Sequence, residues 1–128
     1  MFEFHGWVTV NEGACEAEDS EEARNIAVGK LHELIAARTD GWSLAELRQF
    51  NGQDFLLLHG FRNHYQPWVA ELFEITGVLA PGSYGALYVR DDEDPSYANE
   101  MQVLIMRRGK VVRHKDELFS PCIPVLER

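Results

Sequence analysis

The sequence predicts an α+β fold, with a mostly antiparallel sheet of about six strands and two helices packed on one face. Two segments repeat apolar residues at helical spacing, six have the composition of strands, and their order is β-α-β-β-α-β-β-β. A chain of 128 residues can bury roughly two thirds of its unfolded surface as one domain. Because no linker or internal repeat interrupts it, we expect a single domain over residues 1–128.

The first strand and the first helix occupy the N-terminal part of the chain. Residues Phe2–Val10 alternate in part between apolar and other side chains, and Gly6 indicates a bulge or a close backbone approach. Asp19 is the expected helix N-cap, because Glu22 follows it at the spacing of a capping box. The glutamates of the first turn also interact favourably with the positive end of the helix dipole. Helical spacing continues to Arg38, and residues 39–41 (Thr-Asp-Gly) end the helix.

A hairpin follows this helix. Residues Trp42–Phe50 form the first expected strand, and the dipeptide Asn51-Gly52 is the strongest short hairpin signal in the chain. The second expected strand, Asp54–Phe61, is a nearly continuous apolar run. Such a run is typical of a central strand that is buried on both faces.

The second helix is expected between Asn63 and residue 80. Asn63 has the side chain of an N-cap, and Pro67 falls in the first turn, where a missing N–H costs nothing. Pro81 and Gly82 cannot continue a helix and therefore end it.

Three strands in succession make up the C-terminal part. They are expected at Tyr84–Arg90, Glu100–Arg108 and Val111–Lys115, with a turn at residues 108–110 between the last two. The tail, residues 118–128, contains two prolines and is expected to lie extended along the body of the domain.

The composition favours a cytoplasmic protein with a basic partner. There are 21 acidic and 12 basic residues, a net charge of −9 and a pI near 4.9, which argues against binding to DNA or RNA, because phosphate binding needs a basic surface. No signal peptide or membrane-spanning run is recognisable, so no membrane association is expected. Cys15 and Cys122 belong to no C-x-x-C pair and are expected to be reduced thiols, with a clamp between the chain ends as the less favoured alternative.

The most prominent polar feature is the acidic run Asp91, Asp92, Glu93 and Asp94 after the fourth expected strand. Three interpretations are open: a solvated loop that opposes edge-to-edge pairing, a contact for a basic protein, or a site for Mg²⁺ or Ca²⁺. The metal site ranks last, because the D-x-D-x-D-G spacing of a calcium loop is absent.

No pattern of catalytic residues is present. The five histidines form no H-E-x-x-H motif, although His59 and His64 flank one strand–helix corner. Ser83 follows a helix instead of a strand, the wrong order for a nucleophile elbow, and Cys122 has no histidine placed beside it by sequence. We therefore expect no catalytic residue, no bound metal and no cofactor.

Two further groups of side chains have ordinary structural explanations. The three tryptophans, at positions 7, 42 and 68, lie in apolar patterns and are expected in the core, with partial exposure of Trp7 beside Gly6. The basic residues from Arg107 to Lys115 surround a hairpin turn, where Arg113 and Lys115 are expected to pair with acids on a neighbouring strand.

Several stretches resemble the seventh immunity-protein family of bacterial polymorphic toxin systems. They are F-E-F-H-G-W-V at 2–8, A-P-G-S-Y-G-A-L-Y-V-R-D-D-E-D at 80–94, Asn99, Arg108-Gly109 and L-F-S-P-C-I-P at 118–124. The resemblance runs from one end of the chain to the other. It implies an α+β protein, encoded beside a toxin gene, that binds and neutralises that toxin inside the producing cell. We expect the protein to be a cytoplasmic monomer or homodimer.

The acidic run then becomes the candidate toxin-binding surface. We expect the toxin to be a basic, nuclease-type effector, contacted by the carboxylates of the run and by two aromatic anchors. The expected contact residues are Asp91, Asp92, Glu93, Asp94, Tyr97 and Tyr84. The alternative functions are a small metal-binding protein or hydrolytic enzyme that uses the acidic loop, and a structural or oligomerising module.

Overall fold

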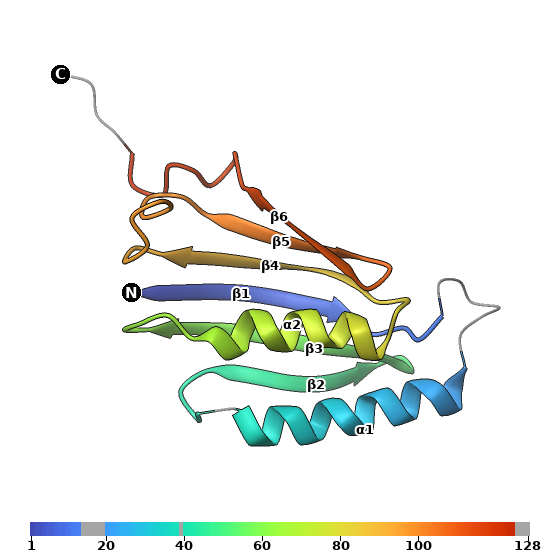
Figure 1. Cartoon of the computed structure of the whole chain (residues 1–128). Helices are drawn as coiled ribbons and strands as arrows, with labels where there is room; N and C mark the ends of the chain where they lie inside the picture. The colour runs from blue at the N-terminus through green and yellow to red at the C-terminus, as the bar shows by residue number, and fades with distance from the viewer. Residues whose placement is uncertain (14–19, 39, 125–128) are drawn as a thin grey trace.

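The computed structural model describes residues 1–13, 20–38 and 40–124 (Figure 1). Its elements follow the order that the sequence predicts, and the α+β fold class is confirmed. In chain order they are β1 (Phe2–Thr9), α1 (Glu21–Arg38), β2 (Leu44–Phe50), β3 (Gln53–Arg62), α2 (Pro67–Leu79), β4 (Tyr84–Asp91), β5 (Gln102–Arg107) and β6 (Lys110–Lys115).

The strands form one sheet in the order β2-β3-β1-β4-β5-β6, and every adjacent pair is antiparallel. α1 connects β1 to β2 across β3, and α2 connects β3 to β4 across β1. These interlocked split β-α-β units make the first six elements a ferredoxin-like arrangement, and the β5–β6 hairpin extends the sheet beyond β4. The acidic run therefore follows a strand near the middle of the sheet.

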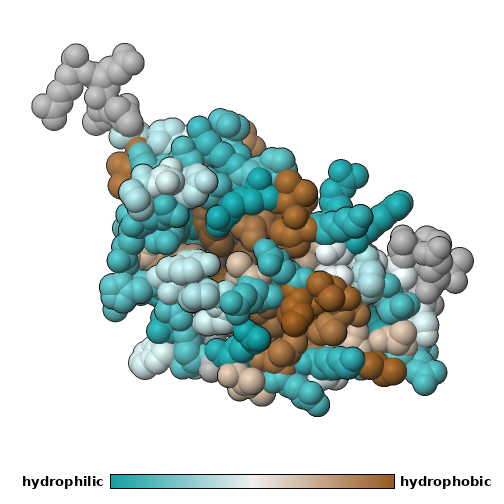
Figure 2. Space-filling view, viewed as in Figure 1, coloured by the Kyte–Doolittle hydropathy of each residue, from teal (hydrophilic) through white to brown (hydrophobic). Residues whose placement is uncertain are grey.

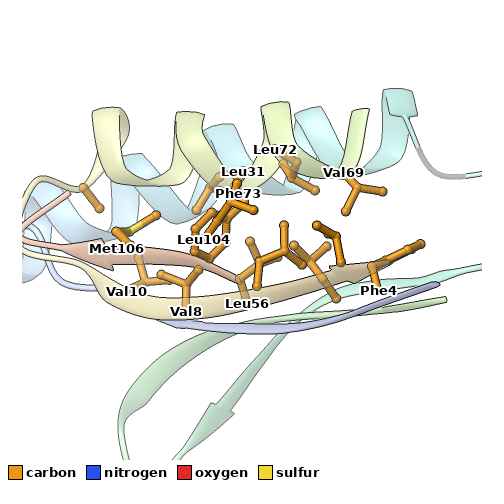
Figure 3. Packing of buried hydrophobic residues seen from close by; sticks show 14 of the residues in the cluster. Phe4, Val8, Val10, Leu31, Leu56, Val69, Leu72, Phe73, Leu104 and Met106 are labelled. Atoms are coloured by element: carbon orange, nitrogen blue, oxygen red, sulfur yellow. The ribbon is translucent and has the colours of Figure 1, made fainter. Parts of the chain in front are cut away.

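Both helices cover the same face of the sheet (Figures 1 and 3). Leu31 of α1 and Leu72 and Phe73 of α2 are fully buried against the strand side chains Phe4 and Leu56, which are also fully buried. Each such side chain contributes about 1.5–3 kcal/mol by leaving water. Seen from the helix side, Figure 2 shows hydrophobic residues gathered over α2 and the strands beside it, with hydrophilic residues around them.

β3 is buried on one face only, so the prediction of a strand buried on both faces is wrong. Leu56 and Leu58 point toward the helices and are fully buried, whereas Phe61 on the other face is 65% exposed. The apolar run is real, but both helices pack on one side and nothing in the described ranges covers this end of β3 on the other.

The helix starts differ from the predicted caps. Asp19 lies outside the described residues, and Ser20 caps α1 by accepting the Ala23 N–H at its Oγ, 3.2 Å away. Asn63 is not the cap of α2, because Gln66 occupies that position and makes no side-chain cap bond. Pro67 at the first helical position lacks an N–H, so the start of α2 has one donor fewer to satisfy.

The three tryptophans have different environments. Trp68 packs against the core with its ring edge-to-face on Phe4, as predicted. Trp7 is 43% exposed, which confirms its partial exposure. Trp42 is 80% exposed and precedes β2, which begins at Leu44, so the prediction that it is a core residue is wrong.

At Gly6, β4 approaches β1 closely, and β1 has no bulge there. Its register with Leu58 on one side and Leu87 on the other is unbroken. A Cβ at this position would lie 2.7 Å from a methyl carbon of Leu87, too close for a side chain.

The tail after β6 is held against the body by Asn99. The Asn99 side chain accepts the Ile123 N–H at 2.7 Å and donates to the Ile123 carbonyl at 3.0 Å. Cys122 is a free thiol, and Cys15 lies outside the described residues. Within the described ranges, no helix has the length and apolar character needed to cross a membrane.

Candidate functional site

The acidic loop, residues 91–94, is built partly by its own carboxylates. Asp91 Oδ1 accepts the N–H of Glu93 at 3.1 Å, and Asp94 Oδ1 accepts the N–H of Ser96 at 2.9 Å. A backbone bond from the Asp94 N–H to the Asp91 carbonyl closes the turn between them. Asp91 and Asp94 therefore fix the conformation of the loop.

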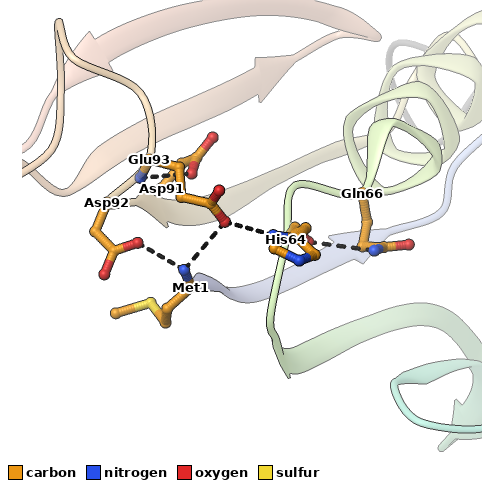
Figure 4. Close-up of polar contacts among 6 residues, drawn as sticks. All are labelled: Met1, His64, Gln66, Asp91, Asp92 and Glu93. Carbon is orange, nitrogen blue, oxygen red and sulfur yellow. Dashed lines mark hydrogen bonds and ion pairs between the residues drawn. The ribbon is translucent and has the colours of Figure 1, made fainter.

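The other two carboxylates contact groups from distant parts of the chain (Figure 4). The Met1 amine lies 2.6 Å from Asp92 Oδ1 and 3.5 Å from Glu93 Oε1. His64 Nδ1, from the β3–α2 connection, lies 2.7 Å from the same Glu93 oxygen. Asp92 and Glu93 remain 42% and 51% exposed, so both can still meet a partner.

These contacts change the pKa values of the groups involved. The hydrogen bond with His64 lowers the pKa of the Glu93 carboxyl, and the positive charges of His64 and the Met1 amine act in the same direction. The hydrogen bond to Asp92 raises the pKa of the Met1 amine. Glu93 therefore stays ionised to lower pH than an ordinary glutamate.

Tyr97 lies beside the acidic loop, as the predicted site requires. Its ring is 37% exposed, and the guanidinium carbon of Arg113 sits 5.9 Å from the ring centroid. Tyr97, Asp91, Asp94 and Tyr65 share the wall of a small hollow of about 270 Å³. Five of the six predicted residues thus form one cluster.

Tyr84 does not belong to that cluster. It begins β4 and Asp91 ends it, so seven residue steps, about 23 Å of extended strand, separate them. Tyr84 instead stacks edge-to-face on Trp7, with the ring centroids 6.1 Å apart. The structure therefore divides the predicted site between the two ends of β4.

The face of the sheet opposite the helices, called here the open face, is the feature that sequence reasoning missed. Side chains alternate along each strand, and the register places one apolar set on this face. Its large apolar members with at least two fifths of their surface exposed are Trp7, Leu44, Phe50, Phe61, Tyr84 and Val112. Both helices lie on the other face of the sheet (Figure 3), so the apolar residues at both alternating positions of β3 were the sequence signal for this exposed face.

Two histidines pair on this open face. His5 and His59 are direct partners in the β1–β3 ladder, and their Nδ1 atoms lie 3.2 Å apart. Burial, and then the charge of His5, lower the pKa of His59. His59 is thus paired with His5, and His64 with Glu93. In the parts of the chain that the structure describes, no three His, Cys, Asp or Glu side chains group so that they could hold a metal ion.

The basic hairpin makes fewer ion pairs than expected. Lys115 Nζ lies 3.9 Å from Glu100, just before β5. Arg113 lies over the Tyr97 ring instead of pairing with an acid. Lys115 thus pairs with an acid, but that acid precedes the strand, and Arg113 pairs with no acid among the described residues, so the prediction of strand-to-strand pairing is wrong for both.

The family model described as Immunity protein 7 matches residues 1–128, the whole length of the chain. No curated protein and no solved structure matches the chain.

Proposed function

The chain belongs to the immunity protein 7 family, and from that premise we propose that it binds and neutralises the cognate toxin of a polymorphic toxin system inside the cell that produces both. The observation that carries the proposal is the family match over the entire chain. The protein acts by binding the toxin and catalyses no reaction. The toxin is encoded beside it.

The acidic loop is proposed as a contact for a basic toxin. The chain has a net charge of −9, and Asp92 and Glu93 present carboxylates at an exposed end of β4. Opposite charges accelerate the encounter of two proteins. A nuclease-type effector has the basic surface that such a loop would recognise, because it must attract phosphate.

The loop is also held in shape before binding. Asp91 and Asp94 accept backbone N–H groups within it, so little conformational entropy is lost when a partner arrives. Tyr97 adds an aromatic surface beside these carboxylates. Tyr84, at the other end of β4, is proposed to contact the toxin at a separate surface.

Co-expression tests the proposed function. The toxin domain encoded by the neighbouring gene should arrest growth of a bacterial host when expressed alone, and expression of this chain should restore growth. Purified toxin and chain should form a complex by isothermal titration calorimetry. Continued growth arrest together with no binding heat would contradict the proposal.

A pair of substitutions that neutralises two carboxylates tests the role of the acidic loop. The variant Asp92→Asn/Glu93→Gln should slow association with the toxin about tenfold or more at low salt and flatten the salt dependence of the rate. The matched control is Glu33→Gln/Glu74→Gln, which removes the same charge from exposed positions on α1 and α2. Equal association rates for the two variants would contradict the assignment of the loop and leave the immunity function standing.

A further inference from the structure

One end of the open face combines exposed aromatic rings with unpaired positive charges. Trp7, Tyr84, Ile105, Arg107 and Lys110 are named here the Trp7 corner. The register aligns Trp7 with Ala86 of β4 and Ala86 with Ile105 of β5, so these side chains form one row across the sheet. Arg107 and Lys110 are the paired residues that flank the β5–β6 turn. The corner therefore has an apolar floor and a basic rim.

The surface at this corner is hollowed. One hollow of about 770 Å³ is lined by Trp7, Tyr84, Ile105 and Arg107 among others. A second hollow of about 690 Å³ lies on the other side of Ile105 and is lined also by Lys110. The two hollows together can receive the side chains of a protein segment that crosses Ile105.

The basic rim differs from several other cations that the structure describes. In the described ranges, Arg107, Arg108 and Lys110 take part in no ion pair, whereas other cations such as Arg38 and Arg62 are paired with carboxylates. This concentration of free positive charge is notable in a chain whose net charge is −9. A partner segment that carries carboxylates would complement this charge.

We propose that the Trp7 corner docks an acidic segment of the toxin that also carries apolar side chains, an inference that rests on the proposed immunity function. The apolar side chains of the segment lie against Trp7 and Ile105, and its carboxylates meet Arg107 and Lys110. Tryptophan, tyrosine and arginine are the residues that most often dominate the binding energy of protein interfaces.

The corner and the acidic loop are separate surfaces of the chain. They lie at opposite ends of β4, about 23 Å apart, and the register places Asp91 on the helix face and Trp7 and Tyr84 on the open face. The two surfaces carry opposite charges. A toxin that contacts both, through a basic region and an acidic segment, would be held in one orientation, because a reversed approach would place like charges together.

Two pairs of matched variants test the proposal. Trp7→Ala is compared with Trp42→Ala, because both tryptophans are exposed but only Trp7 lies at the corner. Lys110→Glu is compared with Lys30→Glu, because both lysines are exposed and the charge change is the same. Affinity for the purified toxin is measured by calorimetry, and thermal unfolding checks that each variant is folded.

The corner variants should each raise Kd for the toxin about tenfold or more, and the two controls should stay within about twofold of the wild type. Hydrogen exchange on the toxin should identify a segment that the wild-type chain protects and the Trp7→Ala variant does not. That segment should be acidic. The inference would be overturned if folded Lys110→Glu binds the toxin with wild-type affinity, or if the toxin segment at the corner is rich in lysine and arginine. Either result would leave the immunity function intact. If the wild-type chain binds no toxin, the proposed function itself fails.

Other occupants of the corner are distinguished by two measurements. Sedimentation of the chain alone should give the same mass for the wild type and Trp7→Ala, and fluorescence anisotropy should show no binding of a single-stranded oligonucleotide. Self-association that Trp7→Ala abolishes would assign the corner to a second copy of this chain. Oligonucleotide binding that Lys110→Glu abolishes would assign it to a nucleic acid. Either result would overturn the inference.

Discussion

Replacement of Gly77 by alanine should destabilise the fold, although alanine is the better helix former. Gly77 is buried in α2, where it faces the β5–β6 turn. A Cβ at Gly77 would lie 2.3 Å from the carbonyl oxygen of Gly109, and a Cβ at Gly109 would lie 2.4 Å from the carbonyl oxygen of Gly77. The helix and the turn are therefore in direct backbone contact, and neither has room for a methyl group.

The magnitude follows from two opposing effects. Alanine gains about 0.5–1 kcal/mol over glycine in a helix interior. Carbon and carbonyl oxygen approach to about 3.3–3.6 Å, so the turn must move by about 1 Å, and overpacking of this kind costs about 1–3 kcal/mol. The movement also stretches the 2.9 Å bond from the Gly109 N–H to the Ser83 carbonyl. The net expectation is a loss of about 1–2 kcal/mol in the free energy of unfolding.

Gly29 provides the matched control. It lies on the exposed side of α1, and nothing lies within 4 Å of a Cβ built there. Gly29→Ala should therefore raise the free energy of unfolding by about 0.5–1 kcal/mol. Urea unfolding followed by circular dichroism at pH 7 measures both variants. If Gly77→Ala is as stable as the wild type or more stable, the close packing of α2 on the turn is wrong.

Four further predictions concern the core and the titrating groups. Phe73→Ala should lower the free energy of unfolding in urea by about 3–5 kcal/mol, because this fully buried ring cannot be replaced without a cavity, and a loss below about 1 kcal/mol would contradict that packing. His59 should titrate by NMR with a pKa below 6.5, and stability should rise with pH between that pKa and 6.5, because the unfolded chain binds more protons there. His5→Gln should raise the pKa of His59 but leave it below 6.5, since burial is the larger cause; no change would exclude the charge of His5 as a cause. His64→Ala should raise the pKa of Glu93 toward 4.5. Glu93 stabilises the fold above pH 4.5, and this stabilisation is lost as the pH falls through the lowered pKa, so the variant should show a smaller loss of stability in acid. An unchanged NMR titration of Glu93 would contradict the contact with His64.

The order of elements could be predicted because each is encoded within a short window of sequence. The apolar spacing of α1, the Asn51-Gly52 turn and the Pro81-Gly82 stop act on neighbouring residues, and each produced its element in the structure. The helix caps were less predictable. Asn63 has the right side chain for a cap, but Gln66 takes the position because Pro67 fixes where α2 begins.

The candidate site could be predicted only in part. The carboxylates of residues 91–94 and Tyr97 are close in sequence, so one loop keeps them together. Their partners, the Met1 amine and His64, come from parts of the chain that only the sheet order brings near. The sequence predicts Tyr84 as an aromatic anchor of the same surface, but an extended strand carries its two ends far apart, and Tyr84 lies at the end opposite the loop.

The sequence by itself determined the charge of this protein, the identity of its helices and strands, and the acidic loop, because these depend on composition and on residues a few positions apart. Only the tertiary structure decided that Trp7 and Tyr84 stand uncovered with Arg107 on the face opposite the helices. It also decided that Gly77 meets Gly109. These outcomes depend on which strands pair and on where each helix crosses the sheet, and no short stretch of sequence contains that information.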